Sequence, residues 1–154
     1  LSGASVEAFE RQGKLPELQV FSNAEQMVQK VAEQLQKNDE AQLTTAIIGK
    51  TLAQCQQLTV DLQAQGVKVT LIKTENQRLA AGNIIVPAFL AKGLEFDAVI
   101  MWDASEQNYH DEDERQLVYT ICSRAMHQLN VVALNELSRL FKRISTDSYE
   151  LITD

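Results

Sequence analysis

The chain has 154 residues, of which 45% are hydrophobic, and its formal net charge is −7 at pH 7. This length and apolar content are typical of one compact domain with its own core. The negative net charge argues against a free-standing protein that binds nucleic acid over a broad basic surface. Any contact with a polynucleotide must therefore be local.

No apolar run approaches the length needed to cross a bilayer, and no charged-then-apolar leader follows Leu1. We therefore expect a cytoplasmic protein without membrane contact. The lack of an initial Met favours an excerpt from a longer protein. Cys55 and Cys122 are far apart in apolar helical patterns, which predicts reduced, buried thiols and neither a disulfide framework nor a metal cluster.

Strand and helix patterns alternate along most of the chain. Residues 1–16 show no clear period and are interpreted as a connector or a remnant of a preceding element, so one domain is expected over residues 17–154. The predicted strands are residues 18–21, 44–48, 67–71, 83–86, 98–102, 131–134 and 149–152. The predicted helices are residues 22–38, 52–66 and, by its apolar spacing, 117–129. The alternation predicts an α/β fold: an open, mostly parallel sheet with helices on both faces.

Several residues mark the ends of these elements. The spacing of Ser22 and Glu25 predicts a capping box at the start of the first helix. Gly66 is placed to close the second helix in a left-handed conformation. Residues 98–102 are apolar without interruption, which predicts a strand that is buried on both faces.

Ligands of such sheets bind at the carboxyl ends of the strands. We expect Gly49-Lys50, the loop at residues 91–95 and Asp103 to lie on that edge. Gly49-Lys50-Thr51 is similar to the end of a phosphate-binding loop, but the required glycine five residues earlier is Thr44. Two interpretations of Lys50 stay open: it points at a phosphate from the end of the strand, or it is an ordinary surface lysine.

Two further clusters favour structural roles. Four consecutive acids, Asp111 to Glu114, follow His110, and they suit the positive end of a helix dipole better than convergence on one metal ion. His127 is interpreted as a dipole partner at the exposed end of its helix. No serine, cysteine and histidine are placed to indicate a nucleophilic triad.

Arg124 lies between Ser123 and Ala125, on a predicted helix face that also holds Tyr119. The segment is otherwise apolar, so the charge needs a specific partner. Two interpretations stay open at this point. One is an ion pair with an acidic neighbour, and the other is an anion that Arg124 reaches across a cleft.

Two stretches carry a resemblance to a known family. AKGLEFDAVI, from residue 91, resembles motif V of superfamily 1 helicases of the UvrD/Rep type, and ERQLVYTICSRAMHQL, from residue 114, resembles motif VI. The motifs occur in the expected order. TAIIGKTLAQC is similar to the region of motif IV, so the resemblance covers Leu18 to Leu134. The phrase FLAKGLEFDAVIMWDA resembles the helicase IV-like branch.

The resemblance implies the second RecA-like motor domain of a DNA helicase, the half that lacks a phosphate loop and closes over ATP. Its partners would be the first motor domain of the same parent chain, which holds ATP with Mg²⁺, and single-stranded DNA. By the family pattern, Arg124 reaches the γ-phosphate as an arginine finger. Glu95 lies near the ribose, and Lys92 and Gly93 link nucleotide state to the bound strand. The isolated chain is not expected to hydrolyse ATP.

Some positions depart from the family pattern. Lys50 stands where motif IV usually offers an arginine toward phosphate, and it keeps the charge without the bidentate fork. Phe89 replaces a histidine that contacts DNA, and a phenylalanine either stacks on a base or fills a core. Pro87 replaces a threonine. Two alternatives to a translocating helicase follow: a motor-derived ATPase that acts on RNA polymerase or another protein partner, and a degenerate domain that serves as a scaffold.

Overall fold

The computed structural model describes residues 15–79, 82–141 and 150–153. The described residues form a seven-stranded sheet with the order β3-β4-β2-β5-β6-β1-β7, and neighbouring strands pair in parallel throughout. The strands are β1 Glu17–Phe21, β2 Thr45–Gly49, β3 Thr70–Leu71, β4 Asn83–Pro87, β5 Phe96–Met101, β6 Ala125–Leu134 and β7 Glu150–Thr153. The predicted α/β class with a parallel sheet is confirmed.

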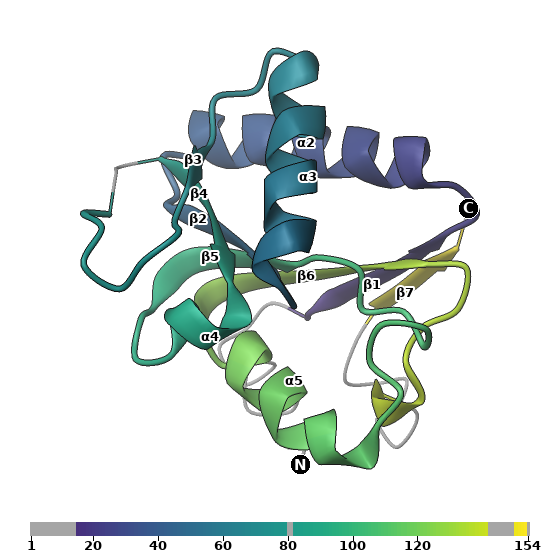
Figure 1. The fold of residues 1–154 in the computed structure, drawn as a ribbon. Helices are drawn as coiled ribbons and strands as arrows, with labels where there is room; N and C mark the ends of the chain where they lie inside the picture. The colour runs from purple at the N-terminus through teal and green to yellow at the C-terminus, as the bar shows by residue number, and fades with distance from the viewer. Residues whose placement is uncertain (1–14, 80–81, 142–149, 154) are drawn as a thin grey trace.

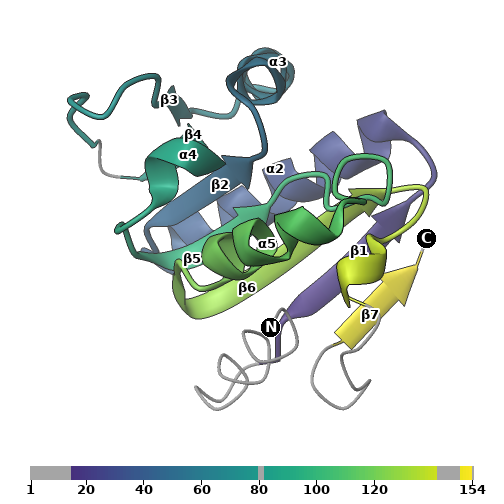
Figure 2. The same ribbon diagram turned by 60° about the horizontal axis from the view of Figure 1, so that its bottom comes forward.

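Helices cover both faces of this sheet (Figures 1 and 2). The helices are α2 Ala24–Glu40, α3 Leu52–Ala64, α4 Ala88–Ala91 and α5 Arg115–Cys122, with 3-10 turns η1 Glu112–Glu114 and η2 Arg139–Phe141. α2 and α3 lie on one face, and α4 and α5 lie on the other. None of these described helices is long and apolar enough to span a membrane.

The central strands are buried on both faces because successive side chains of a strand point in opposite directions. In β5, Ile100 packs in the cluster under α2 and α3, whereas its neighbours Val99 and Met101 pack in the cluster under α4 and α5. β2 repeats this division with Ile47 and Ile48. The prediction of a strand buried on both faces at residues 98–102 is confirmed.

The start of α2 and the end of α3 show which local sequence signals set the boundaries of these helices. Asn23 caps α2, with its side-chain oxygen accepting a 2.8 Å hydrogen bond from the Gln26 N–H, so the predicted capping box of Ser22 and Glu25 is wrong by one residue. Asparagine is as good an N-cap as serine, and it is the nearer of the two to the helix. Gly66 follows α3 with φ +80°, as predicted.

The helix predicted over residues 117–129 is wrong beyond Cys122. α5 ends there, and Ala125 already belongs to β6. Leu117, Ile121, Ala125 and Leu129 recur every four residues, but a spacing of four is also a multiple of the strand period of two. The pairing of Phe96 with Ala125 therefore decided the state of these residues.

The remaining strand predictions differ in extent. β3 is confined to Thr70–Leu71, although residues 67–71 alternate as a strand would. β7 at Glu150–Thr153 agrees with the strand predicted around residues 149–152. The predicted connector at residues 1–16 lies almost wholly outside the described residues.

Buried protonated groups predict that the domain loses stability in alkali. Burial raises the pKa of the Cys55 thiol to about 11 and that of Cys122 to about 12, and it raises the pKa of the Tyr109 hydroxyl far above its usual value. Because the folded state holds these protons more tightly than the unfolded chain, their contribution is fully present below pH ~9 and is lost as the pH rises beyond that value.

Urea denaturation at pH 7.5 and at pH 10.5 checks this expectation. The midpoint should fall at the higher pH, and Tyr109→Phe should reduce the part of the fall that occurs above the usual tyrosine pKa of about 10. Equal midpoints at both pH values would show that these groups titrate alike in the folded and unfolded chain.

Candidate functional site

The predicted site residues lie at two opposite edges of the sheet. Lys50 and Asp103 follow β2 and β5 at the carboxyl edge, whereas Glu95 directly precedes β5 and Arg124 directly precedes β6 at the amino edge. β5 has six residues, so about 16 Å separate its two ends.

The prediction that residues 91–95 share the carboxyl edge with Lys50 is therefore wrong. After β4 ends, the chain forms the single turn α4 and then returns across the face of the sheet before β5 begins. Glu95 thus reaches the amino edge, where Arg124 lies. The Phe96 N–H donates a 3.0 Å hydrogen bond to the Arg124 carbonyl, which joins the two segments directly.

Arg124 occupies the turn between α5 and β6. Its backbone N–H donates to the Ile121 carbonyl at 3.2 Å. Its half-buried side chain folds back toward the end of the helix: Nε donates to the Thr120 carbonyl at 3.1 Å, and Nη2 donates to the Ser123 hydroxyl at 3.3 Å. The arginine side chain is thereby held by neutral oxygen atoms.

No carboxylate neutralises this guanidinium within residues 15–79 and 82–141. The ion pairs there are Lys30–Glu17, Lys50–Glu114, Arg115–Glu112 and Arg139–Glu106. Among these residues, Arg124 therefore does not form the structural ion pair that was one of its two interpretations. A half-buried guanidinium that only neutral groups hold keeps its full positive charge and N–H donors that can bind an anion.

Next to this arginine, a β-bulge interrupts the pairing of β5 with β6. Phe96 pairs with Ala125 and Ala98 pairs with Gln128, so β6 carries one extra residue in this interval. Met126 and His127 are consequently both exposed. The prediction that His127 lies at the end of a helix is wrong, because the residue belongs to β6. Bulges of this kind re-aim side chains at the ends of strands.

The one acidic side chain of β5 already has partners at this edge. Asp97 accepts hydrogen bonds from the Thr44 N–H at 2.9 Å and from the Thr44 hydroxyl at 3.1 Å. The Thr44 N–H holds the pKa of Asp97 below its usual value, and the charge of His127 adds to the effect. Asp97 therefore fastens the start of β2 to β5, and Glu95 is left as the exposed carboxylate beside Arg124.

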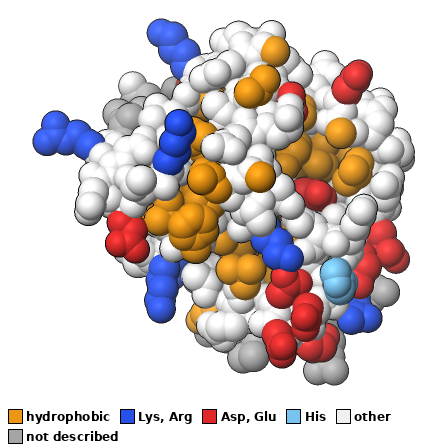
Figure 3. Space-filling model, viewed as in Figure 1, with side chains coloured by type: hydrophobic (Ala, Val, Ile, Leu, Met, Phe, Trp, Pro, Cys, Tyr) orange, Lys and Arg blue, Asp and Glu red, His pale blue; other side chains and the backbone are white. Residues whose placement is uncertain are grey.

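The α4 turn presents an exposed aromatic ring. Ala88 and Ala91 are buried and anchor the turn, while the Phe89 side chain is 63% exposed. In Figure 3, hydrophobic side chains gather on the surface in the region of α4, with basic side chains nearby. Lys92 is exposed, and Gly93 adopts φ +83°, a conformation that favours glycine. Phe89 therefore does not fill the core.

At the carboxyl edge, the loop after β5 encloses Lys50. The Lys50 ammonium forms an ion pair with Glu114, donates to the Asn108 carbonyl at 2.8 Å and lies 5.4 Å from the centre of the Tyr109 ring. The Asn108 side chain donates in turn to the Asp103 carbonyl at 2.9 Å. The positive charge of Lys50 is thus already neutralised within the domain.

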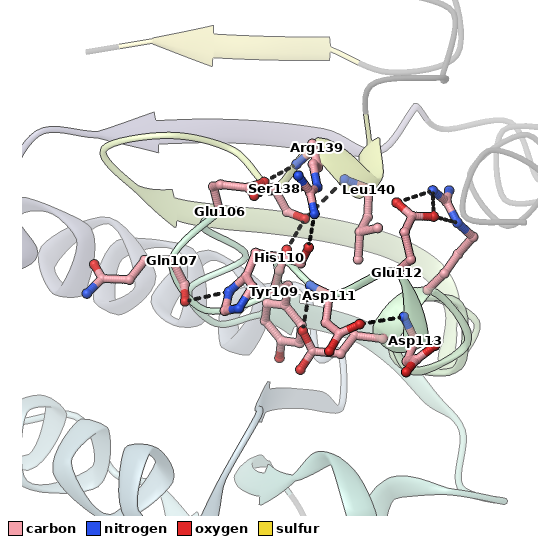
Figure 4. Close-up of polar contacts among 12 residues, drawn as sticks. Glu106, Gln107, Tyr109, His110, Asp111, Glu112, Asp113, Ser138, Arg139 and Leu140 are labelled. Carbon is pink, nitrogen blue, oxygen red and sulfur yellow. Dashed lines mark hydrogen bonds and ion pairs between the residues drawn. The ribbon is translucent and has the colours of Figure 1, made fainter.

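Figure 4 shows the polar contacts of the acidic residues 111–113 in this loop. The Asp111 carboxylate accepts from the Asp113 N–H at 3.0 Å, and the Glu114 carboxylate accepts from the Asp111 N–H at 3.2 Å, so the two form a capping box. Arg139 donates to the His110 carbonyl at 2.6 Å. The described residues contain no group of three or more His, Cys, Asp or Glu side chains that could hold a metal ion.

The sequence singled out Arg124 as a candidate but gave no indication of the groups that hold its side chain. Thr120 and Ser123 precede the arginine by four residues and by one residue. Their contacts depend on α5 ending at Cys122, and the four-residue apolar spacing had concealed that end. The signal that was available is the polar Ser-Arg pair that follows an apolar helix, because polar side chains commonly satisfy the carbonyl groups of a final turn.

Comparison with known proteins places these observations in a family. Residues 85–132 match the UvrD-like helicase C-terminal domain. The structure is similar to the C-terminal domain of a possible DNA helicase from Lactobacillus plantarum WCFS1, with a TM-score of 0.88 and 55% identity over 97% of this chain and 92% of that chain.

A DNA complex of arterivirus nonstructural protein 10, a helicase, shares the fold alone: the TM-score is 0.54 and the identity is 8%, over 97% of this chain and 37% of that chain. No curated protein sequence matches the chain. The similarity to the Lactobacillus domain nevertheless covers almost the whole of both chains at high identity. The chain therefore belongs to the family of UvrD-like helicase C-terminal domains.

Proposed function

We propose that this chain is the second motor domain of an ATP-dependent DNA helicase. It would complete the ATP site of a first motor domain in the same parent protein and couple hydrolysis to movement along single-stranded DNA. The observation that carries the proposal is the half-buried Arg124 guanidinium, which no carboxylate neutralises in the described part of the chain.

The donor groups of Arg124 suit a terminal phosphate. A guanidinium has five N–H donors, and two of them are used by Thr120 and Ser123. The other three have no partner among the described residues and are available to an anion at the domain surface. When bound between the two motor domains, ATP with Mg²⁺ supplies the phosphoryl group that is transferred. Arg124 would stabilise the negative charge that develops on that group.

The position of Glu95 also favours the amino edge of the sheet as the place where the nucleotide binds. Its exposed carboxylate lies one residue before Phe96, whose N–H is bonded to the Arg124 carbonyl. A carboxylate in this position can accept hydrogen bonds from the hydroxyl groups of a ribose. Lys50 is left out of the proposed contacts, because it is paired with Glu114 at the opposite edge.

The exposed ring of Phe89 is proposed to stack on a base of the DNA strand, with Lys92 near the backbone. Phe89→Ala should weaken binding of single-stranded DNA by the full-length protein about tenfold, the usual cost of losing one aromatic–base stack. Fluorescence anisotropy with a labelled oligonucleotide checks this. Leu79→Ala is the matched control, since Leu79 is 43% exposed in the loop between β3 and β4 and should leave affinity unchanged.

The ATPase activity of the full-length protein tests the proposed function. Stimulation by single-stranded DNA, with an affinity that falls as salt concentration rises, is the expected result. Stimulation by RNA polymerase alone would instead favour a motor that acts on a protein partner. Activity that neither partner changes would favour a scaffold. The isolated chain should show no hydrolysis in the same assay, because it carries no phosphate loop.

A further inference from the structure

The Ser123 hydroxyl makes two hydrogen bonds, one as a donor and one as an acceptor. It donates to the Thr120 carbonyl at 3.0 Å, and the same oxygen accepts from Arg124 Nη2 at 3.3 Å. The Ser123 backbone is fixed independently, since its N–H donates to the Tyr119 carbonyl at 3.0 Å in the last turn of α5. The serine thus has a set position and a set hydroxyl direction.

The direction of the hydroxyl matters for the arginine. Because the hydroxyl proton points to Thr120, the lone pairs of the serine oxygen are left to accept from the guanidinium. The Thr120 carbonyl holds Nε at 3.1 Å from another direction. Two acceptors on two different nitrogen atoms fix the plane of the guanidinium as well as its place, and a long flexible side chain is otherwise free to rotate.

From this arrangement, and on the basis of the proposed function above, we propose that Ser123 is a positioning residue that orients the Arg124 guanidinium toward the terminal phosphate of ATP. The serine does not touch the nucleotide in this account. It presents the free N–H groups of Arg124 in one orientation before the two motor domains close, so that less rotational freedom is lost when the phosphate is engaged.

Ser123→Ala removes one of the two acceptors. ATP turnover by the full-length protein should fall about tenfold, because a small misplacement of a catalytic group is costly. KM for ATP should change by less than about twofold, since an arginine finger acts mainly on the charge that develops in the transition state. Ser123→Thr keeps the hydroxyl and should retain turnover within about threefold of the original protein.

A double-mutant cycle separates positioning from a merely structural role. If Ser123 acts through Arg124, Ser123→Ala should have almost no further effect on kcat in a protein that already carries Arg124→Ala. Ser123→Gly gives a second deletion of the hydroxyl, because glycine is tolerated at helix ends. Thr74→Ala is the matched control for removal of an exposed hydroxyl, and it should leave kcat unchanged.

The outcomes distinguish this inference from the function on which it rests. A large loss with Arg124→Ala and none with Ser123→Ala would overturn the positioning role and leave the arginine finger standing. An equal loss from Ser123→Ala with and without Arg124 would also overturn it, because the serine would then act elsewhere. Normal turnover with Arg124→Ala would contradict the proposed function itself, and with it the role of Ser123.

Discussion

Replacing Arg124 with alanine is expected to lower the ATP turnover of the full-length protein by about a thousandfold or more, the usual size of the effect for an arginine finger. The three free donors of its guanidinium are the groups available to the terminal phosphate, and alanine removes all of them. Arg124→Lys should recover little of the turnover, because a lysine ammonium cannot present a planar set of donors. Steady-state kinetics over a range of ATP concentrations gives kcat and KM for each variant.

The loss should not come from unfolding. The Arg124 side chain contacts two neutral oxygen atoms and leaves no buried carboxylate unpaired when it is removed. Arg139→Ala is the matched control, since Arg139 is an arginine at the carboxyl edge that pairs with Glu106. Its turnover should stay near that of the original protein. Near-normal turnover in Arg124→Ala would mean that another group stabilises the transition state.

Tyr109→Ala is expected to have the largest effect on stability among the substitutions considered, lowering the free energy of unfolding by about 3–5 kcal/mol. The Tyr109 ring is fully buried beneath the loop that encloses Lys50, and it packs in the core under α5. Alanine would leave a cavity there and would also remove the ring that faces the lysine ammonium.

Tyr109→Phe separates the ring from its hydroxyl. The buried hydroxyl oxygen has no hydrogen-bond partner among the described residues, so phenylalanine should be neutral or slightly stabilising. Urea denaturation at neutral pH measures both variants. A loss of several kcal/mol in Tyr109→Phe would show that the hydroxyl is hydrogen-bonded in solution.

Much of the fold follows from local chemistry. The uninterrupted apolar run at residues 98–102 predicted a strand covered on both faces, and Ile100 and Met101 pack on opposite sides of the sheet. Gly66 closes α3 as its position predicted. These predictions hold because each depends on residues that lie close together in the chain.

The boundary between α5 and β6 could not be predicted in the same way. A repeat of four apolar residues fits one face of a helix, and it also fits one face of a strand, so the spacing of Ile121, Ala125 and Leu129 cannot choose between them. The choice was made by pairing with β5, a contact with residues almost thirty positions earlier in the chain.

The positions of the candidate site residues in the fold were predicted in part. The family resemblance named Arg124 and Glu95, and the structure brings their segments together through the Phe96–Arg124 hydrogen bond. The expectation that Glu95 shares the carboxyl edge with Lys50 and Asp103 is wrong, because the connection from β4 to β5 returns to the amino edge before Glu95. Because β4 and β5 run parallel, the connection between them has to end at the amino edge, so the position of Glu95 directly before β5 was enough to place it there.

A structure of the full-length protein with Mg²⁺ and a non-hydrolysable ATP analogue tests the central claim most directly. We expect the Arg124 guanidinium to lie about 2.7–2.9 Å from oxygen atoms of the terminal phosphate, at the amino edge of the sheet, while Lys50 stays paired with Glu114. A terminal phosphate bound by Lys50 at the carboxyl edge, with Arg124 pointing elsewhere, would contradict it.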